Sequence, residues 1–234
     1  MTTVIDNLQR VHSRIAAACA AAGRPVDSVT LLAVSKTFPP EAVHTAFAAG
    51  QRQFGENYVQ EALDKISALA DLRSQLTWHL IGPLQSNKTR PVAAAFDWVH
   101  SVDRLKIAMR LSEQRPAGLP PLQVCLQVNI SGEASKSGLL PADVPAVAQA
   151  VALLPRLRLR GLMAIPEPAA AAAAQPAPHR ALRELLATLN TTGLALDTLS
   201  MGMSADLEAA VAEGATLLRV GTAIFGSRTV PAAA

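Results

Sequence analysis

The sequence predicts an α/β fold in which eight parallel strands close into a single (β/α)8 TIM barrel, with one extra helix at the N-terminus. Short apolar strands alternate with helical segments along the whole chain of 234 residues, and this alternation is typical of a parallel sheet covered by helices. There are eight such strands, the number that closes a barrel. No linker divides the chain, so residues 1–234 are expected to form one domain. A doubly wound open sheet is the alternative.

The first 49 residues are predicted to form a helix, a strand and a second helix. Residues 4–22 carry apolar side chains at helical spacing and are followed by Gly23, which predicts the extra N-terminal helix. Residues 29–36 form an apolar run with β-branched side chains, which predicts the first strand. Two prolines then mark the start of a helix over residues 40–49, because proline is well tolerated in a first helical turn.

The rest of the chain repeats this strand–helix unit. Each further strand is short and apolar, and they are expected at residues 51–55, 76–81, 98–102, 122–130, 157–165, 198–201 and 216–220. Helices are expected between them at residues 57–73, 86–95, 103–113, 142–154, 179–190 and 206–213. The connector 166–178 is rich in Pro and Ala and is expected to be a loop or a frayed helix, because prolines bracket its alanines.

Composition excludes several classes of protein. The net charge is only +3, and no basic run interleaves with aromatic side chains, so no nucleic-acid partner is expected. Cys19 and Cys125 lie far apart without metal or redox spacing, which fits a reducing compartment. We find neither a signal-peptide pattern nor an apolar stretch long enough to span a bilayer. A soluble, cytoplasmic protein without a membrane partner is therefore expected.

Lys36 stands at the end of the first predicted strand, where turn residues are more usual than an ammonium group. With the two-residue period of a strand, Leu32, Val34 and Lys36 share one face. If that face looks into the barrel, burial would leave the amine neutral and nucleophilic, as a Schiff-base lysine requires. The alternative is a solvated lysine just past the strand, which is the commoner arrangement when only the local pattern is considered.

Small residues follow the last two predicted strands. Residues 200–204 read Ser-Met-Gly-Met-Ser, and Gly221 and Thr222 follow the eighth strand. Backbone N–H groups at such positions can bind an anion, and TIM barrels often hold a phosphate after strands 7 and 8. The glycines could instead serve only tight turns. Arg219 lies inside the apolar eighth strand, where it either points outward beneath the last helices or inward toward an acceptor.

Together these features describe one ligand. A lysine amine, a phosphate cradle and an inward arginine match the aldehyde, phosphate and ring nitrogen of pyridoxal 5′-phosphate (PLP). His79, in the apolar third strand, is either a hydrogen-bonded core residue or a ring that stacks on a flat ligand. The other histidines show no partners at metal-ligand spacing, so no metal site is expected.

Short motifs that occur in the same order as in a known family lie along almost the whole chain, at residues 32–37, 54–61, 78–88, 128–130, 136–138, 161–166, 200–204 and 219–226. They resemble the motifs of the YggS/PROSC family of pyridoxal phosphate homeostasis proteins. The resemblance implies a barrel like the N-terminal domain of alanine racemase (PLP fold type III). It also implies that PLP is held as an internal aldimine on Lys36.

The cofactor-binding residues that the resemblance implies are Lys36, Asn57, His79, Met163, Ser200, Met201, Gly202, Arg219, Gly221 and Thr222. Among these, Arg219 would face the pyridine nitrogen. Ser200, Gly202, Gly221 and Thr222 would hold the phosphate. Asn57, His79 and Met163 would neighbour the ring. The chain departs from the family in the connector 166–178, which lacks the polar and aromatic side chains often present there.

The expected function is that of a carrier without catalytic residues, which binds PLP reversibly and buffers or delivers it. The alternative is a PLP-dependent amino-acid racemase or decarboxylase. Racemases of this fold use a second base, usually a tyrosine. Tyr58, the sole tyrosine here, follows strand 2 without an evident route to the substrate face. A lysine-dependent aldolase without cofactor is a third hypothesis, and it leaves Arg219 without a role.

The expected partners are PLP and, transiently, apo forms of PLP-dependent enzymes. A monomer is expected because the dimer of alanine racemase depends on a second domain. Lys65, Lys88 and Lys136 are expected to be solvated surface lysines rather than cofactor-binding groups.

Overall fold

The computed structural model of the protein describes residues 3–133, 136–165 and 176–226. Its strands form a closed barrel in the order β1 to β8, and each strand runs parallel to its neighbours. The strands are β1 (Thr30–Val34), β2 (Gln53–Glu56), β3 (Thr77–Leu80), β4 (Trp98–Val102), β5 (Leu122–Gln127), β6 (Leu157–Met163), β7 (Thr198–Ser200) and β8 (Leu217–Val220). The predicted (β/α)8 barrel is confirmed, and the open sheet is excluded because β1 pairs with β8.

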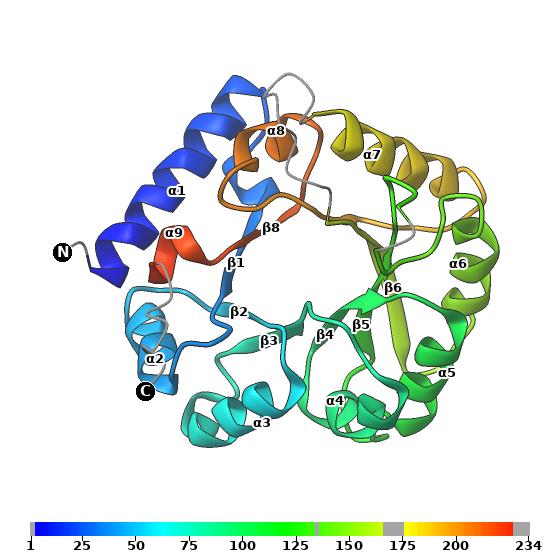
Figure 1. Ribbon diagram of the computed structural model, residues 1–234, viewed down its shortest axis with the longest axis horizontal. Helices are drawn as coiled ribbons and strands as arrows, with labels where there is room; N and C mark the ends of the chain where they lie inside the picture. Colours follow the sequence, from blue (N-terminus) through cyan, green and yellow to red (C-terminus); the bar gives the residue numbers. More distant parts are fainter. Residues whose placement is uncertain (1–2, 134–135, 166–175, 227–234) are drawn as a thin grey trace.

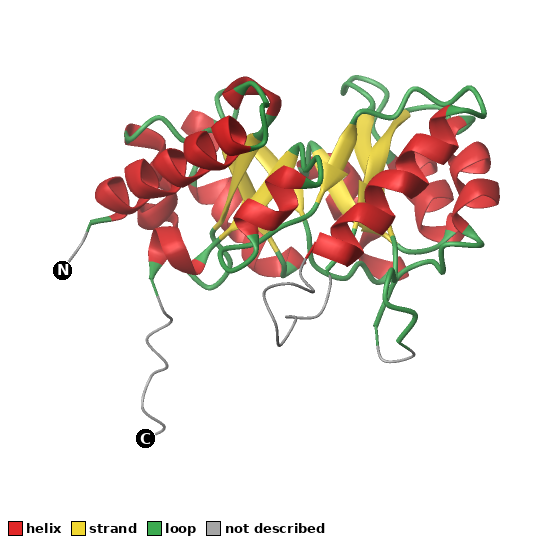
Figure 2. Cartoon of the chain, turned by 90° about the horizontal axis from the view of Figure 1, so that it is seen from above, coloured by secondary structure: helices red, strands yellow, loops and turns green. Residues whose placement is uncertain are grey.

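Helices surround the barrel as a ring (Figure 1). They are α1 (Val4–Ala21), α2 (Pro40–Ala48), α3 (Val59–Ala68), α4 (Thr89–Ala95), α5 (Leu105–Gln114), α6 (Val144–Ala152), α7 (Pro176–Asn190), α8 (Leu207–Ala212) and the short α9 (Thr222–Phe225). The described residues also form the single-turn 3-10 helices η1 (Val26–Ser28), η2 (Ala70–Leu72) and η3 (Ser86–Lys88). Figure 2 shows the strands enclosed by the helices, with loops at both ends of the barrel.

The extra helix α1 lies beside α8 and α9 in the ring (Figure 1). Thr3 caps its first turn, because the Thr3 hydroxyl accepts from the Asp6 N–H and the Asp6 carboxylate accepts from the Thr3 N–H. The Asn7 side chain donates to the carbonyl oxygen of Ile224 in α9 at 2.8 Å. The N-terminal helix thus holds the segment that follows β8.

Several elements begin or end at other residues than predicted, and for two of these boundaries the reason can be identified. The first strand ends at Val34 instead of residue 36, because Thr37 has a positive φ of 67° and the chain turns there. The helix expected at 179–190 begins at Pro176, where the missing N–H of proline does no harm in a first turn. Most of the connector 166–178, residues 166–175, lies outside the described residues.

The core has two layers. Between strands and helices it is mostly aliphatic, and its largest fully buried side chains are Trp78, Phe54 and Phe96. Inside the barrel, four apolar side chains form a separate small cluster, Leu32, Val34, Ile81 and Leu217. Leu32 and Val34 therefore share the inward face, as the two-residue period predicted. Within the part of the chain that the structure describes, no helix is long and apolar enough to cross a membrane.

Candidate functional site

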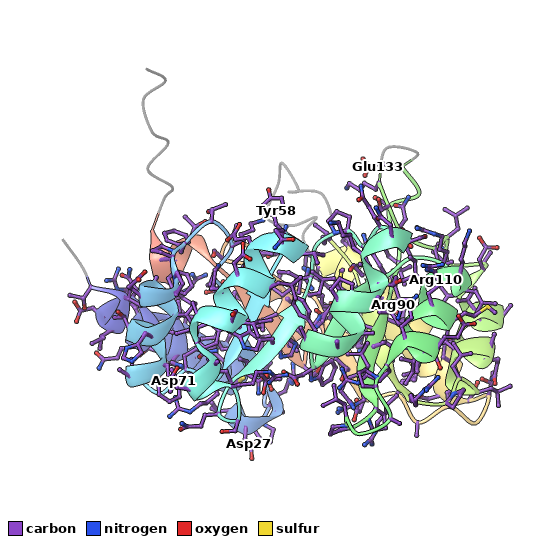
Figure 3. The ribbon with its side chains drawn as sticks, turned by 90° about the horizontal axis from the view of Figure 1, so that it is seen from below. Asp27, Tyr58, Asp71, Arg90, Arg110 and Glu133 are labelled. Carbon is purple, nitrogen blue, oxygen red and sulfur yellow. The ribbon has the colours of Figure 1, made fainter. Side chains whose placement is uncertain are left out.

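The barrel has a pocket at each end. One pocket, of about 230 Å³, is lined by residues that follow the strands: Asn57, Ile81, Gly82, Pro83, Gln127, Val128, Asn129, Lys136, Ser137 and Ile165. The other, of about 260 Å³, is lined mostly by residues at or before the strand starts, together with His79 and Arg160 from within β3 and β6: Ser28, Thr30, Gln53, His79, Trp98, Arg160, Asp197, Thr198, Thr216 and Leu217. Figure 3 shows these two ends, with Tyr58 and Glu133 at the first and Asp27 at the second.

The carboxyl-end pocket contains a buried acceptor without a partner. The Oδ1 atom of Asn57 is buried and has no hydrogen-bond partner within the described residues. Buried polar atoms are almost always paired, so this oxygen marks a place where a ligand or a water molecule is expected to donate. Asn57 was among the residues expected to neighbour a cofactor ring, and it lines this pocket.

Gly82 fixes the position of Asn57. A Cβ atom at residue 82 would lie 2.1 Å from the carbonyl oxygen of Asn57 and 2.6 Å from its Cα, so no side chain fits there without moving the backbone. We expect Gly82→Ala to displace the Asn57 loop, to destabilise the fold by about 1–3 kcal/mol, and to weaken ligand binding at the pocket. Chemical denaturation and titration with PLP measure the two effects. Wild-type values for both would contradict this account.

Lys36 lies in a turn just past β1, and this turn is close to the end of β8. Ser35 is buried, and its N–H donates to the carbonyl oxygen of Gly55 at 3.0 Å. A Cβ atom at Gly221 would lie 3.2 Å from the carbonyl oxygen of Val34, so a glycine permits this close approach. Because β1 pairs with β8, the predicted lysine and one predicted phosphate-binding glycine come together at one edge of the carboxyl-end mouth.

Arg219 points inward, which resolves the alternative that its sequence left open. Only 4 % of its surface is exposed. Its Nη1 donates to the carbonyl oxygen of Ser200 at 2.5 Å and to the Ser200 hydroxyl at 2.7 Å, and its Nη2 donates to the carbonyl oxygen of Ala164 at 2.8 Å. Burial lowers the pKa of Arg219 to about 10, opposed by the charge of Asp206, so the guanidinium remains a cation at neutral pH.

A chain of hydrogen bonds runs from Arg219 through the barrel. The Ser200 hydroxyl lies 2.8 Å from Nδ1 of His100, whose Nε2 lies 2.9 Å from Nδ1 of His79. Nε2 of His79 lies 2.7 Å from the Oε1 atom of Gln53. Since a guanidinium can only donate, one direction serves every member: Arg219 donates to Ser200, Ser200 to His100, His100 to His79, and His79 to Gln53. Both imidazoles are then neutral and carry their proton on Nε2.

His79 and His100, the two histidines in this series of hydrogen bonds, resist protonation. Burial lowers the pKa of His79 from 6.5 to about 3. Burial, and then the charges of His79 and Arg219, also lower the pKa of His100 well below its usual value. The contribution of His79 to stability is therefore complete above pH 6.5 and is lost as pH falls from there toward about 3, and the contribution of His100 is lost in the same direction.

For His79, we expect this loss to reach about 1.4 kcal/mol per pH unit below pH 6.5. Urea unfolding at several pH values between 6.5 and 4.5 measures the slope. The variant His79→Gln lacks one of these groups, so its stability should fall less steeply with decreasing pH than that of the wild type. Equal slopes would show that His79 takes up its proton in the folded state as readily as in the unfolded one.

The other predicted residues are placed as follows. Gly202 has a φ of 89°, its carbonyl oxygen accepts from the Arg219 N–H at 3.0 Å, and a Cβ there would lie 2.4 Å from the Cβ of Ala210. Met163 is buried and stands opposite Ser200 in the sheet register. Thr222 is exposed at the first position of α9. Met201 instead packs in the outer core between barrel and helices.

His79 and Ser200 differ most from expectation. His79 lines the amino-end pocket, stacks on Trp98 with a ring separation of 5.4 Å, and has both ring nitrogens engaged. The expectation that His79 neighbours a cofactor ring is therefore not supported; it is the hydrogen-bonded core residue that the sequence also allowed. Ser200 is fully buried, and its hydroxyl already contacts Arg219 and His100. A phosphate at this segment would therefore bind to backbone N–H groups and not to the Ser200 hydroxyl.

Sequence reasoning missed several polar residues. Gln53 and His100 had not been recognised, although His100 shares a strand face with Trp98. Lys65, expected to be solvated, is only 2 % exposed and forms an ion pair with the fully buried Glu56, with 2.6 Å between Nζ and Oε1. A signal was present, because Lys65 lies on the same helical stripe as the buried Ala62 and Leu69. No cluster of metal-binding side chains occurs among the residues described.

Tyr58 lies at the carboxyl-end face, on the same side as Glu133 (Figure 3). Its side chain is 52 % exposed, and it is not among the residues that line the carboxyl-end pocket. Tyr58 reaches this face because β2 ends at Glu56 and the chain emerges there, and the sequence-based expectation that it has no evident route to a substrate stays a prediction.

Comparison with known proteins agrees with this architecture. Residues 7–229 match the sequence profile of the alanine racemase N-terminal domain. The pyridoxal phosphate homeostasis protein of Pseudomonas aeruginosa is 67 % identical over 228 residues, which cover 97 % of each chain. That of Escherichia coli K12 is 55 % identical, covering 97 % of this chain and 98 % of the relative.

Solved structures extend the likeness to three dimensions. PipY of Synechococcus elongatus with PLP bound is 41 % identical and has a TM-score of 0.84, with coverage of 96 % of this chain and 100 % of PipY. An alanine racemase of Corynebacterium glutamicum, 17 % identical with a TM-score of 0.67, shares the fold, and this chain spans 63 % of it. The chain therefore belongs to the YggS/PROSC family of pyridoxal phosphate homeostasis proteins, built on the alanine racemase N-terminal domain.

Proposed function

We propose that the protein binds PLP at the carboxyl-end mouth of the barrel, with the cofactor held as an internal aldimine on Lys36. One observation carries the proposal: pairing of β1 with β8 brings the Lys36 turn beside Gly221, two residues after the buried cation of Arg219. The unpaired oxygen of Asn57 supports the fit, since it offers an acceptor at the same end of the barrel. PipY, a structural relative, has been solved with PLP bound.

Each proposed site residue would contact the part of PLP that its own chemistry suits. PLP supplies an aldehyde that condenses with a primary amine and releases water, and Lys36 supplies that amine. Arg219 can donate but not accept, so a pyridine nitrogen facing it would stay unprotonated. Gly202, Gly221 and Thr222 would surround the phosphate, with backbone N–H groups as donors. Met163 would lie near the ring.

Labelling tests this proposal directly. The purified protein is incubated with PLP, reduced with borohydride, digested and analysed by mass spectrometry. We expect a yellow protein and a stable adduct on the peptide that contains Lys36. Lys65, Lys88 and Lys136 serve as internal controls within the same digest. A colourless protein without adduct, or an adduct on other lysines only, would reject the proposed site.

We further propose that the protein is a carrier which buffers PLP and delivers it to apo-enzymes, and that it acts as a cytoplasmic monomer. The close relatives are named for PLP homeostasis rather than for a reaction. Transfer is measured by adding the loaded protein to an apo form of a PLP-dependent enzyme and following the recovery of activity. A rate no faster than with free PLP at equal concentration would count against delivery, and sedimentation would test the monomer.

A racemase or decarboxylase is the second candidate, favoured by the position of Tyr58 at the carboxyl-end face. Its phenol is exposed and could act as a base only if the side chain turned toward the mouth. A panel of amino acids is tested for racemisation and decarboxylation with the wild type, Lys36→Ala and Tyr58→Phe. Turnover that is lost in both variants would replace the carrier with an enzyme.

A further inference from the structure

The turn that carries Lys36 is held in a strained conformation. Thr37 has a φ of 67°, in the left-handed region that β-branched residues rarely adopt. Strain of this kind persists only where the surroundings enforce it, and it concentrates at functional sites. The structure therefore has to contain groups that hold Thr37, and these groups are found on α3, which lies outside β2 and β3 in Figure 1.

Glu61 on α3 holds the turn from one side. The Thr37 N–H donates to Oε1 of Glu61 at 2.5 Å. The same oxygen accepts from Nζ of Lys65 at 3.0 Å. Glu61 is partly exposed, with 30 % of its side chain accessible, and its ionised carboxylate makes the bond from the Thr37 N–H charge-assisted.

Lys65 holds the turn from the other side. Its three N–H donors meet the carbonyl oxygen of Ser35 at 2.8 Å, Glu56 at 2.6 Å and Glu61 at 3.0 Å. The Ser35 hydroxyl also donates to Oε1 of Glu56 at 2.7 Å. The residues on either side of Lys36 thus both form hydrogen bonds with one ion cluster, which consists of the buried Glu56 and Lys65 and the partly exposed Glu61.

We infer that Glu61 and Lys65 are positioning residues for Lys36. They hold the Ser35–Thr37 turn so that the Lys36 main chain is already fixed before the cofactor arrives. A fixed turn loses less conformational freedom when the amine condenses with an aldehyde, so capture is faster and tighter. The role in PLP capture rests on the proposed function. The contacts by which Glu61 and Lys65 hold the Ser35–Thr37 turn, which we call the clamp, do not depend on PLP.

Amide hydrogen exchange of the cofactor-free protein tests the clamp. Glu61→Ala removes the acceptor of the Thr37 N–H, so protection across residues 35–38 should fall about tenfold or more, as expected for a hydrogen bond to a charged group. Glu61→Gln keeps an oxygen at this place and should restore part of the protection. Asp64→Ala is the matched control, because Asp64 is an acidic residue of the same helix whose side chain accepts from Gln60.

The rate at which PLP is fixed by borohydride is then measured for the same variants. We expect about tenfold slower capture by Glu61→Ala, partial rescue by Glu61→Gln, and no change with Asp64→Ala, at melting temperatures close to the wild type. Wild-type protection and capture in Glu61→Ala would overturn the inference. So would a loss of capture that only parallels a lower melting temperature, because the role would then be structural.

Two outcomes separate this inference from the proposed function. If the wild type fails to capture PLP, the proposed function fails, and exchange at residues 35–38 still decides whether the clamp exists. If Glu61→Ala does not fold, Glu61→Gln decides instead. Its neutral amide is a weaker acceptor, so reduced protection supports the inference and wild-type protection refutes it.

Discussion

Replacing Lys65 by methionine is expected to lower the free energy of unfolding by about 3–5 kcal/mol, the largest stability effect we anticipate for a single substitution. The reason is the carboxylate that remains. Glu56 is fully buried, and its Oε2 atom already has no partner among the described residues. Burial raises the pKa of Glu56, and the Lys65 charge opposes that shift, so loss of Lys65 leaves an uncompensated acid in the core.

Urea unfolding of Lys65→Met at neutral pH measures the loss. The double variant Glu56→Gln/Lys65→Met removes both charges and keeps an oxygen to accept from the Ser35 hydroxyl. It should recover most of the stability, since replacing both members of a buried pair is often nearly neutral. Lys88→Met, at an exposed position, is the control and should remain within about 0.5 kcal/mol of the wild type. A similarly small change in Lys65→Met would show that the ion pair is dispensable.

Lys36→Ala is expected to abolish covalent capture of PLP, the largest functional effect we anticipate. Without the amine no carbon–nitrogen bond to the aldehyde can form, so the variant should be colourless after gel filtration and carry no adduct after borohydride reduction. Arg219 and the segments after β7 and β8 remain, so weak non-covalent binding should persist. Absorbance and intact-protein mass spectrometry measure the two states.

The control for this variant is Lys88→Ala, which removes an exposed lysine and leaves the Lys36 turn intact. It should bind PLP as the wild type does. Lys36 is partly exposed in a turn, and its replacement should therefore have little effect on stability. Undiminished adduct formation in Lys36→Ala would move the attachment site to another lysine and end the present assignment.

The fold and part of the site could be predicted from the sequence because they depend on local periodicity. The two-residue period correctly placed Leu32 and Val34 on one face, and the proline pair before α2 correctly marked a helix start. Lys36 was expected to end the first strand, but it lies in the turn that follows β1. The sequence did not predict this turn, because the left-handed conformation of Thr37 is not visible in a hydrophobic pattern.

Pairings between distant residues could not be predicted in this way. His100 and Ser200 are 100 residues apart and meet at 2.8 Å inside the barrel. Their contact depends on the register of several strands and on closure of the sheet, neither of which a local pattern contains. The same holds for His79, whose apolar strand allowed both a core position and a ligand position.

The sequence by itself therefore determined the number, order and parallel arrangement of the strands, and it marked Lys36 and Arg219 as charges in unusual places. The tertiary structure alone decided which way Arg219 points, that His79 belongs to the amino-end half of the barrel, and that Lys65 is buried beneath the Lys36 turn. The physical reason is that a buried polar group is defined by its partners, and here the partners come from different strands and helices.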